Sequence, residues 1–138
     1  MEFAKLIQKA KEAKEQAYAP YSGFHVGAAL LCKDGTIFTG CNIENSAYGP
    51  TNCAERTAIF KAVSEGFSEF EAIAIISDSK QPTAPCGVCR QVMAEFCSRD
   101  FQVLMLGCEG IQRTASLGEL LPYAFSLEWL HPYRLPFF

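Results

Sequence analysis

Three cysteines in two short motifs constrain this chain more than any other feature of its sequence. Residues 52–56 read NCAER, and residues 85–90 read PCGVCR. Cysteines at the spacing of Cys53, Cys86 and Cys89 can hold one zinc ion and leave its fourth position open. Structural zinc sites use four protein ligands, whereas catalytic sites use three and a water molecule. The sequence therefore predicts a catalytic zinc site, with Glu55 close enough to move protons.

Two other interpretations of these cysteines remain open at this point. One is a structural zinc site, which would need a fourth thiol. Cys97 would lie about 12 Å beyond Cys89 along a helix, too far to share the ion. The spacing does not exclude Cys41 as the fourth ligand. A redox role for the Cys86-x-x-Cys89 pair would leave the first motif without a function. Two further cysteines in apolar, strand-like segments are interpreted as core residues, Cys32 and Cys108.

Length and composition favour one soluble domain over residues 1–138. No apolar run approaches the roughly 20 residues of a membrane span, and the apolar residues of the N-terminal segment recur at helical spacing rather than as in a signal peptide. Seven cysteines, an odd number, argue against a closed disulfide framework and favour the cytoplasm. A net charge of −3 with scattered basic residues favours a small-molecule substrate over nucleic acid.

The pattern of apolar residues and turns predicts alternating strands and helices. The expected helices are 2–18, 53–65, 86–97 and 117–121, and the expected strands are 26–32, 36–41, 71–77 and 102–106, with a hairpin turn at 34–35. This order implies an α/β fold in which helices pack on a sheet. The hairpin makes one pair of strands antiparallel and the later crossovers should be parallel, so we expect a mixed, mostly parallel sheet.

Both cysteine motifs fall at predicted helix starts. Residues one turn apart, such as Cys86 and Cys89, can face the same point, and helix N-termini favour thiolates. Three thiolates leave a zinc centre net negative. Arg56 and Arg90 are nearby cations that we expect to offset this charge by hydrogen-bonding sulfur.

Several further segments resemble the small, homotetrameric cytidine deaminases over nearly the whole length of the chain. They are residues 19–22 (APYS), Phe24, 26–29 (VGAA), 40–45 (GCNIEN), 53–56 (CAER) and 85–91 (PCGVCRQ). The resemblance implies a three-layer α/β/α sandwich and one zinc ion per chain. It also implies hydrolytic deamination of cytidine and deoxycytidine in pyrimidine salvage, by a homotetramer with shared active sites.

The same resemblance implies roles for individual residues. Cys53, Cys86 and Cys89 would bind zinc, and Glu55 would carry protons between water, the cytosine ring and the leaving ammonia. Arg56 resembles the family's cation beside the metal ligands. The remaining residues would contact the substrate: Asn42 and Glu44 at the ribose 3′-hydroxyl, Phe24 packed on the base, the backbone of Ala54 at the pyrimidine, Tyr48 near the sugar at a subunit boundary, and Phe125 from a neighbouring subunit.

Elementary chemistry supports part of this assignment, and two alternative functions remain. A buried carboxylate such as Glu44 would need a hydrogen-bond donor, which a sugar hydroxyl provides. A deaminase of the blasticidin S type would share the metal motifs, but a ribose-recognising Glu44 favours the nucleoside enzymes. A non-catalytic zinc-binding module would have no use for Glu55. His25 and His131 are interpreted as structural or exposed, and the aromatic tail, residues 129–138, favours a subunit interface.

Overall fold

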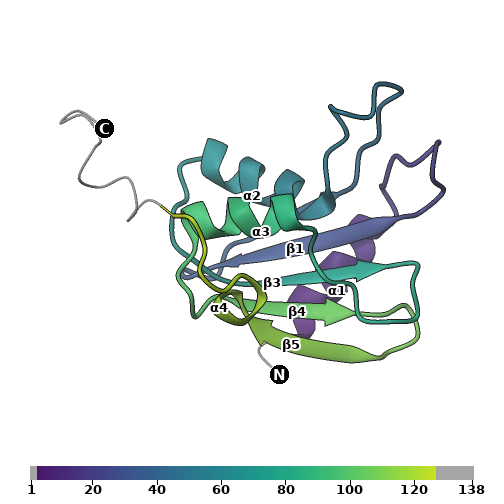
Figure 1. Cartoon of the computed structure of the whole chain (residues 1–138). Helices are drawn as coiled ribbons and strands as arrows, with labels where there is room; N and C mark the ends of the chain where they lie inside the picture. The colour runs from purple at the N-terminus through teal and green to yellow at the C-terminus, as the bar shows by residue number, and fades with distance from the viewer. Residues whose placement is uncertain (1–2, 127–138) are drawn as a thin grey trace.

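The computed structural model describes residues 3–126, which form four helices and five strands (Figure 1). In chain order these are α1 (Ala4–Lys14), β1 (Val26–Cys32), β2 (Ile37–Cys41), α2 (Ala54–Ser64), β3 (Phe70–Ser77), α3 (Gly87–Phe96), β4 (Gln102–Leu106), β5 (Gln112–Ser116) and α4 (Leu117–Leu120). His131 and the aromatic tail lie outside the described residues. None of the helices within 3–126 is both long enough and apolar enough to cross a membrane.

The strands form one sheet in the order β2-β1-β3-β4-β5. Strand β1 is antiparallel to both of its neighbours, β4 and β5 are antiparallel, and β3 and β4 are parallel. The sheet is therefore mixed, as predicted, but the expectation of a mostly parallel sheet is wrong. Strands β2 and β3 do run in the same direction on either side of the α2 crossover. They are not neighbours, however, because β1 lies between them.

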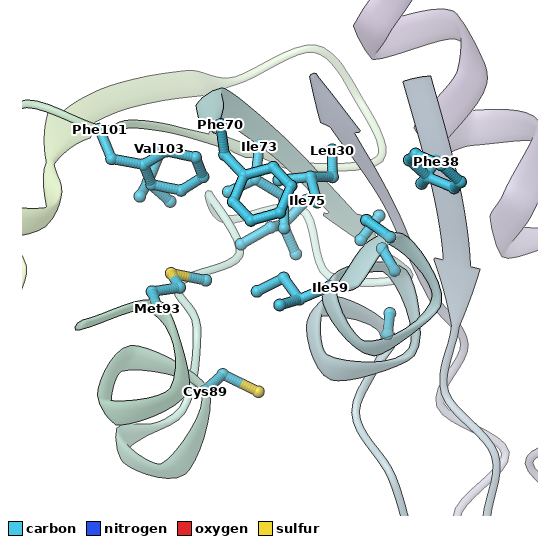
Figure 2. Close-up of a cluster of buried hydrophobic side chains, with 14 of the residues drawn as sticks. Leu30, Phe38, Ile59, Phe70, Ile73, Ile75, Cys89, Met93, Phe101 and Val103 are labelled. Atoms are coloured by element: carbon cyan, nitrogen blue, oxygen red, sulfur yellow. The ribbon is translucent and has the colours of Figure 1, made fainter. Parts of the chain in front are cut away.

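Helices cover both faces of the sheet, which confirms the three-layer α/β/α sandwich. Helix α1 lies on one face and helices α2 and α3 lie on the other (Figure 1). Strand β3 contributes to the cores on both faces because its side chains alternate. Ile73 and Ile75 belong to the core beneath α2 and α3. Ala72 and Ala74 belong to the core beneath α1. Figure 2 shows the first of these cores, in which Cys89 of α3 is one of the buried members.

Glycines in β1 and β2 allow two helices to approach the sheet closely. A Cβ atom added to Gly40 would lie 2.5 Å from the carbonyl oxygen of Ala54, and one added to Gly27 would lie 2.2 Å from that of Ala10. Only glycine fits such contacts with backbone atoms. Because Ala54 is the first residue of α2, the contact at Gly40 fixes the height of that helix start above the sheet.

Two elements differ from the sequence expectation. Helix α1 ends at Lys14, not near Tyr18, because Tyr18 instead donates its N–H to Asn42 O at 2.9 Å and accepts from Glu44 N at 2.8 Å. Strand β5, Gln112–Ser116, was not predicted. It is polar and largely exposed at the sheet edge, so it lacks the apolar alternation by which strands are recognised.

Candidate active site

Three thiols from two helix starts converge on one point. Cys53 and Cys86 are the N-cap residues of α2 and α3, and Cys89 lies in the first turn of α3. Their sulfur atoms all lie within 4.8 Å of one another, and the Sγ atoms of Cys53 and Cys86 are 3.7 Å apart. Tetrahedral zinc with Zn–S bonds of about 2.3 Å places its sulfur ligands about 3.8 Å apart, far beyond the roughly 2.05 Å of a disulfide. The donor set therefore fits zinc with three protein ligands.

Hydrogen bonds stabilise negative charge on these sulfur atoms. Arg56 Nη2 donates to Cys53 Sγ at 3.2 Å, and the backbone N–H of Cys89 donates to Cys86 Sγ at 3.4 Å. The pKa of Cys53 is lowered to about 5, first by the hydrogen bond from the Cys89 thiol and then by Arg56 and Cys86, which outweigh the effect of burial. The thiolate form of Cys53, which is the form that binds metal, is thus favoured at neutral pH.

The other candidate partners of the metal lie elsewhere. Arg90 does not contact sulfur, so that expectation is wrong: its Nε donates to Pro85 O and its Nη1 to Leu120 O, both at 2.8 Å. Within residues 3–126, the three converging cysteines are the only cluster of three or more metal-binding side chains, and Cys41 is not among them. Cys32 is buried as predicted, whereas Cys108 is exposed and is not a core residue.

Glu55 lies on the buried side of the first turn of α2, two residues after Cys53. Only 4% of its surface is exposed. Burial, and to a smaller extent the Cys53 thiolate, raises the pKa of Glu55 to about 7, against the opposing effects of its own backbone N–H and of Arg56. A helix N-terminus would by itself favour the anion, so desolvation dominates here. The carboxyl group can therefore both accept and donate a proton near neutral pH.

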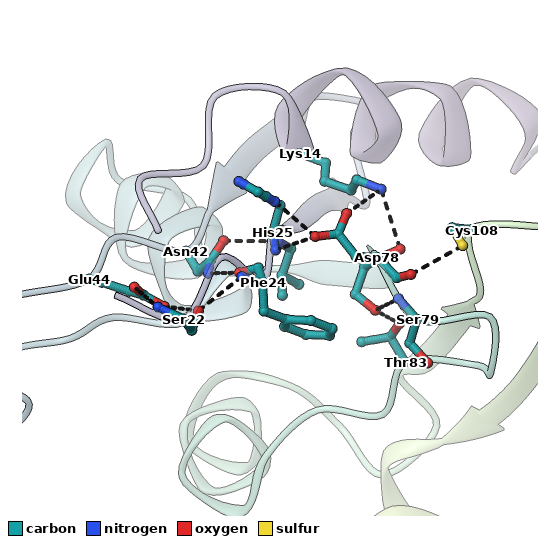
Figure 3. A network of polar contacts seen from close by, with 12 residues as sticks. Lys14, Ser22, Phe24, His25, Asn42, Glu44, Asp78, Ser79, Thr83 and Cys108 are labelled. Carbon is teal, nitrogen blue, oxygen red and sulfur yellow. Dashed lines mark hydrogen bonds and ion pairs between the residues drawn. The ribbon is translucent and has the colours of Figure 1, made fainter. Parts of the chain in front are cut away.

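Asn42 holds the backbone on both sides of His25, through Phe24 and Val26 (Figure 3). Its Oδ1 accepts from Val26 N at 2.9 Å, and its Nδ2 donates to Phe24 O at 2.8 Å. Asn42 is buried, whereas Phe24 is 42% exposed and so is not a core residue. One N–H and one lone pair of the Asn42 amide remain for a ligand.

Glu44 accepts more hydrogen bonds from the chain than the sequence suggested. It is partly exposed rather than buried, and its Oε1 accepts from Tyr21 N at 3.0 Å and Ser22 N at 3.1 Å, while its Oε2 accepts from Ser22 Oγ. The Ser22 hydroxyl, and then the Ser22 N–H, lower the pKa of Glu44 below its usual range. The expectation that this carboxylate is buried and lacks donors is wrong, although one of its roughly four acceptor positions stays open.

A pocket of about 320 Å³ brings Glu44 together with Tyr48, and its other lining residues are Tyr21, Ser22, Asn45 and Thr51. Tyr48 is 80% exposed. Ala54 is buried as the first residue of α2, where a backbone N–H has no partner inside the helix. Phe125 is exposed, and its carbonyl accepts from Gln91 Nε2 at 2.8 Å. The substrate contacts assigned to these residues stay predictions.

Sequence reasoning missed a charged cluster around Asp78, the residue after β3. Asp78 Oδ2 lies 2.8 Å from both the backbone N and the Nδ1 of His25, and Oδ1 lies 3.0 Å from Lys14 Nζ (Figure 3). The N–H of His25, then its side chain and Lys14, lower the pKa of Asp78 to about 2. The three residues are far apart in sequence, so no motif marks them.

Known proteins are similar to this chain in both sequence and fold. Residues 2–105 match the family described as the cytidine and deoxycytidylate deaminase zinc-binding region. A cytidine deaminase of Sporosarcina psychrophila is 56% identical over 128 residues, which cover 93% of this chain and 94% of the relative. The crystal structure of cytidine deaminase from Burkholderia pseudomallei is 52% identical with a TM-score of 0.85, over 88% of this chain and 97% of that one.

The rival antibiotic-deaminase family is more distant. A blasticidin-S deaminase of Bacillus cereus is 32% identical over 110 residues, which cover 74% of this chain and 77% of the relative. The zinc-binding region that matches includes all three converging cysteines and Glu55. This chain belongs to the cytidine and deoxycytidylate deaminase family.

Proposed function

We propose that this protein catalyses the hydrolytic deamination of cytidine and deoxycytidine, giving uridine or deoxyuridine and ammonia. The observation that carries the proposal is the set of three thiols within 4.8 Å of one another beside Glu55, a buried carboxyl group with a pKa of about 7. Cys53, Cys86 and Cys89 would hold the zinc ion. When bound, zinc supplies a nucleophile for C4 of the cytosine ring at neutral pH by lowering the pKa of water.

Glu55 performs the proton transfers in this proposal. It accepts a proton from the attacking water and delivers it to N3 of the cytosine ring. It then takes the remaining proton from the hydroxyl group now on C4 and passes it to the amino group, which leaves as ammonia when the C4–N bond breaks and the C4 carbonyl forms. A group that both accepts and donates works best with a pKa near the working pH, and burial gives Glu55 that property.

The loops beside α2 bind the nucleoside. Phe24 packs on the base, and the backbone N–H of Ala54 at the start of α2 contacts the pyrimidine. Asn42 and Glu44 bind the ribose 3′-hydroxyl. The open acceptor position of Glu44, in a pocket that also contains Tyr48, supports this assignment.

We also infer that the protein is a single catalytic domain that works in the cytoplasm as a homotetramer, with Phe125 contributed across a subunit boundary. Seven free cysteines suit a reducing compartment. Exposed aromatic side chains suit an interface, with Tyr123 98% and Phe125 57% exposed.

Ammonia release by the zinc-loaded protein tests the activity directly. Cytidine and deoxycytidine should both be converted, and blasticidin S should be a much poorer substrate. Release from blasticidin S alone would instead identify an antibiotic deaminase. A protein that binds zinc fully and releases no ammonia from any of the three would be a non-catalytic zinc-binding module.

A further inference from the structure

The hydroxyl group of Ser22 connects two residues that the proposed function assigns to different parts of the nucleoside. It donates to Oε2 of Glu44, the residue assigned to the sugar, and it accepts from the backbone N–H of Phe24, the residue assigned to the base, at 3.0 Å (Figure 3). Gly23, between Ser22 and Phe24, has a φ of +69°. This left-handed conformation, which favours glycine, turns the Phe24 N–H back toward the hydroxyl.

Ser22 determines how Glu44 is oriented. The Glu44 carboxylate accepts three hydrogen bonds from the chain, and two of them come from Ser22, through its N–H and its hydroxyl. Both carboxylate oxygens are therefore fixed by one residue. Hydrogen bonds to a charged acceptor are stronger and more directional than neutral ones, so the open acceptor position of Glu44 points in one direction.

The backbone around Phe24 is held on every side. Ser22 Oγ binds the N–H of Phe24, Asn42 binds its carbonyl, and Asp78 binds the N–H of His25. The Ser22 hydroxyl bonds directly both to the Glu44 carboxylate and to the backbone of Phe24. Loss of this hydroxyl would therefore loosen the position of Glu44 relative to Phe24.

We propose that Ser22 is a positioning residue for sugar discrimination. Its hydroxyl orients the Glu44 carboxylate toward the sugar and fixes the position of that carboxylate relative to Phe24. This inference rests on the proposed function. It concerns how the sugar site is built, and Ser22 itself takes no part in the proton transfers.

The substitution Ser22→Ala tests it, with cytidine and 3′-deoxycytidine as paired substrates. Loss of the hydroxyl should raise KM for cytidine roughly 10-fold, the scale of one charge-assisted hydrogen bond, and leave kcat within about twofold. The kcat/KM preference for cytidine over 3′-deoxycytidine should fall toward that of Glu44→Gln. Ser22→Thr, which keeps a hydroxyl, should restore most of the preference.

Three comparisons separate positioning from a general structural role. Ser68→Ala removes an exposed hydroxyl from another loop and should leave the preference and the melting temperature unchanged. Adding Ser22→Ala to Glu44→Gln should lower the preference no further. An unchanged preference in Ser22→Ala, or an equal loss on both substrates that Ser22→Thr does not repair, overturns the inference alone. A wild-type protein inactive on cytidine overturns the proposed function as well.

Discussion

At the scale of single residues, burial and local charge set the chemistry of Glu55. The residue sits in the first turn of a helix, where its anion would be favoured, yet desolvation raises its pKa to about 7. Glu55→Gln keeps the size of the side chain and removes the proton carrier. We expect full zinc content and a fall in turnover of roughly 100-fold or more.

Zinc analysis and ammonia release on the same sample check this expectation. Glu71→Gln, an exposed position on β3, is the matched control and should behave as the wild type. Near-normal turnover of Glu55→Gln at full zinc occupancy would remove Glu55 from the mechanism.

Asp78 shows how a partly exposed residue can contribute to stability in a pH-dependent way. Its pKa in the folded protein is about 2, below the value of about 3.9 in an unfolded chain. Its contribution is therefore fully present above about pH 4 and is lost as the pH falls through 2. Because the side chain is 37% exposed, solvent screening limits the contribution, and we expect Asp78→Asn to cost about 1 kcal/mol at pH 7.

Urea unfolding at several pH values measures this contribution. The difference in unfolding free energy between the wild type and Asp78→Asn should narrow as the pH is lowered from 4 toward 2. Asp100→Asn, at an exposed position, should cost little at any pH. A difference that stays constant with pH would contradict the linkage.

Single residues were predictable where chemistry requires a local spacing. Cys53 and Glu55 are two residues apart on one helix turn, and Cys86 and Cys89 are three apart, so the motif alone indicated the cluster. Ser22 and Asp78 gave no such indication, because their partners are brought close only by the fold.

At the scale of secondary-structure elements, buried strands and helices were predictable and polar edges were not. The apolar strands β1 and β4 have the predicted bounds, because their burial requires apolar side chains. Strand β5 consists of polar residues apart from Ala115, and it pairs only with β4. The end of α1 was also missed, because its last predicted turn is replaced by pairing between Tyr18 and Ile43, a long-range contact.

Helix α3 has a second role besides carrying Cys86 and Cys89. Its Arg90 connects Pro85 O, directly before the metal motif, to Leu120 O at the end of α4. A lysine keeps the charge but has one compact donor group in place of the guanidinium fork. Arg90→Lys should therefore leave one carbonyl without its donor and cost about 1–3 kcal/mol of stability.

Chemical denaturation and amide exchange near Leu120 report this loss. Arg113→Lys, on the exposed strand β5, is the control and should remain as stable as the wild type. If Arg90→Lys is equally stable and its exchange near α4 is unchanged, Arg90 does not join the two helices.

At the scale of the whole molecule, several large apolar residues of the described chain lie at the surface. Tyr48, Tyr123 and Phe125 are each more than half exposed, although a chain of this size has a buried core on both faces of its sheet. Apolar groups of this kind gather at interfaces. The pocket at Glu44 is also lined by the exposed Tyr48, so a neighbouring chain that covered Tyr48 would complete it.

Closed symmetry then favours a dimer of dimers, and we expect four chains in solution. Gel filtration with light scattering, run together with the activity assay, measures both properties on one sample. Dilution to monomers should abolish deamination while zinc is retained, because each site would lose a residue supplied by its neighbour. Phe125→Ala should raise KM without loss of metal, whereas Phe125→Leu should have a smaller effect because it keeps most of the apolar contact. A monomer with full activity would contradict shared active sites, because a complete site would then lie within one chain.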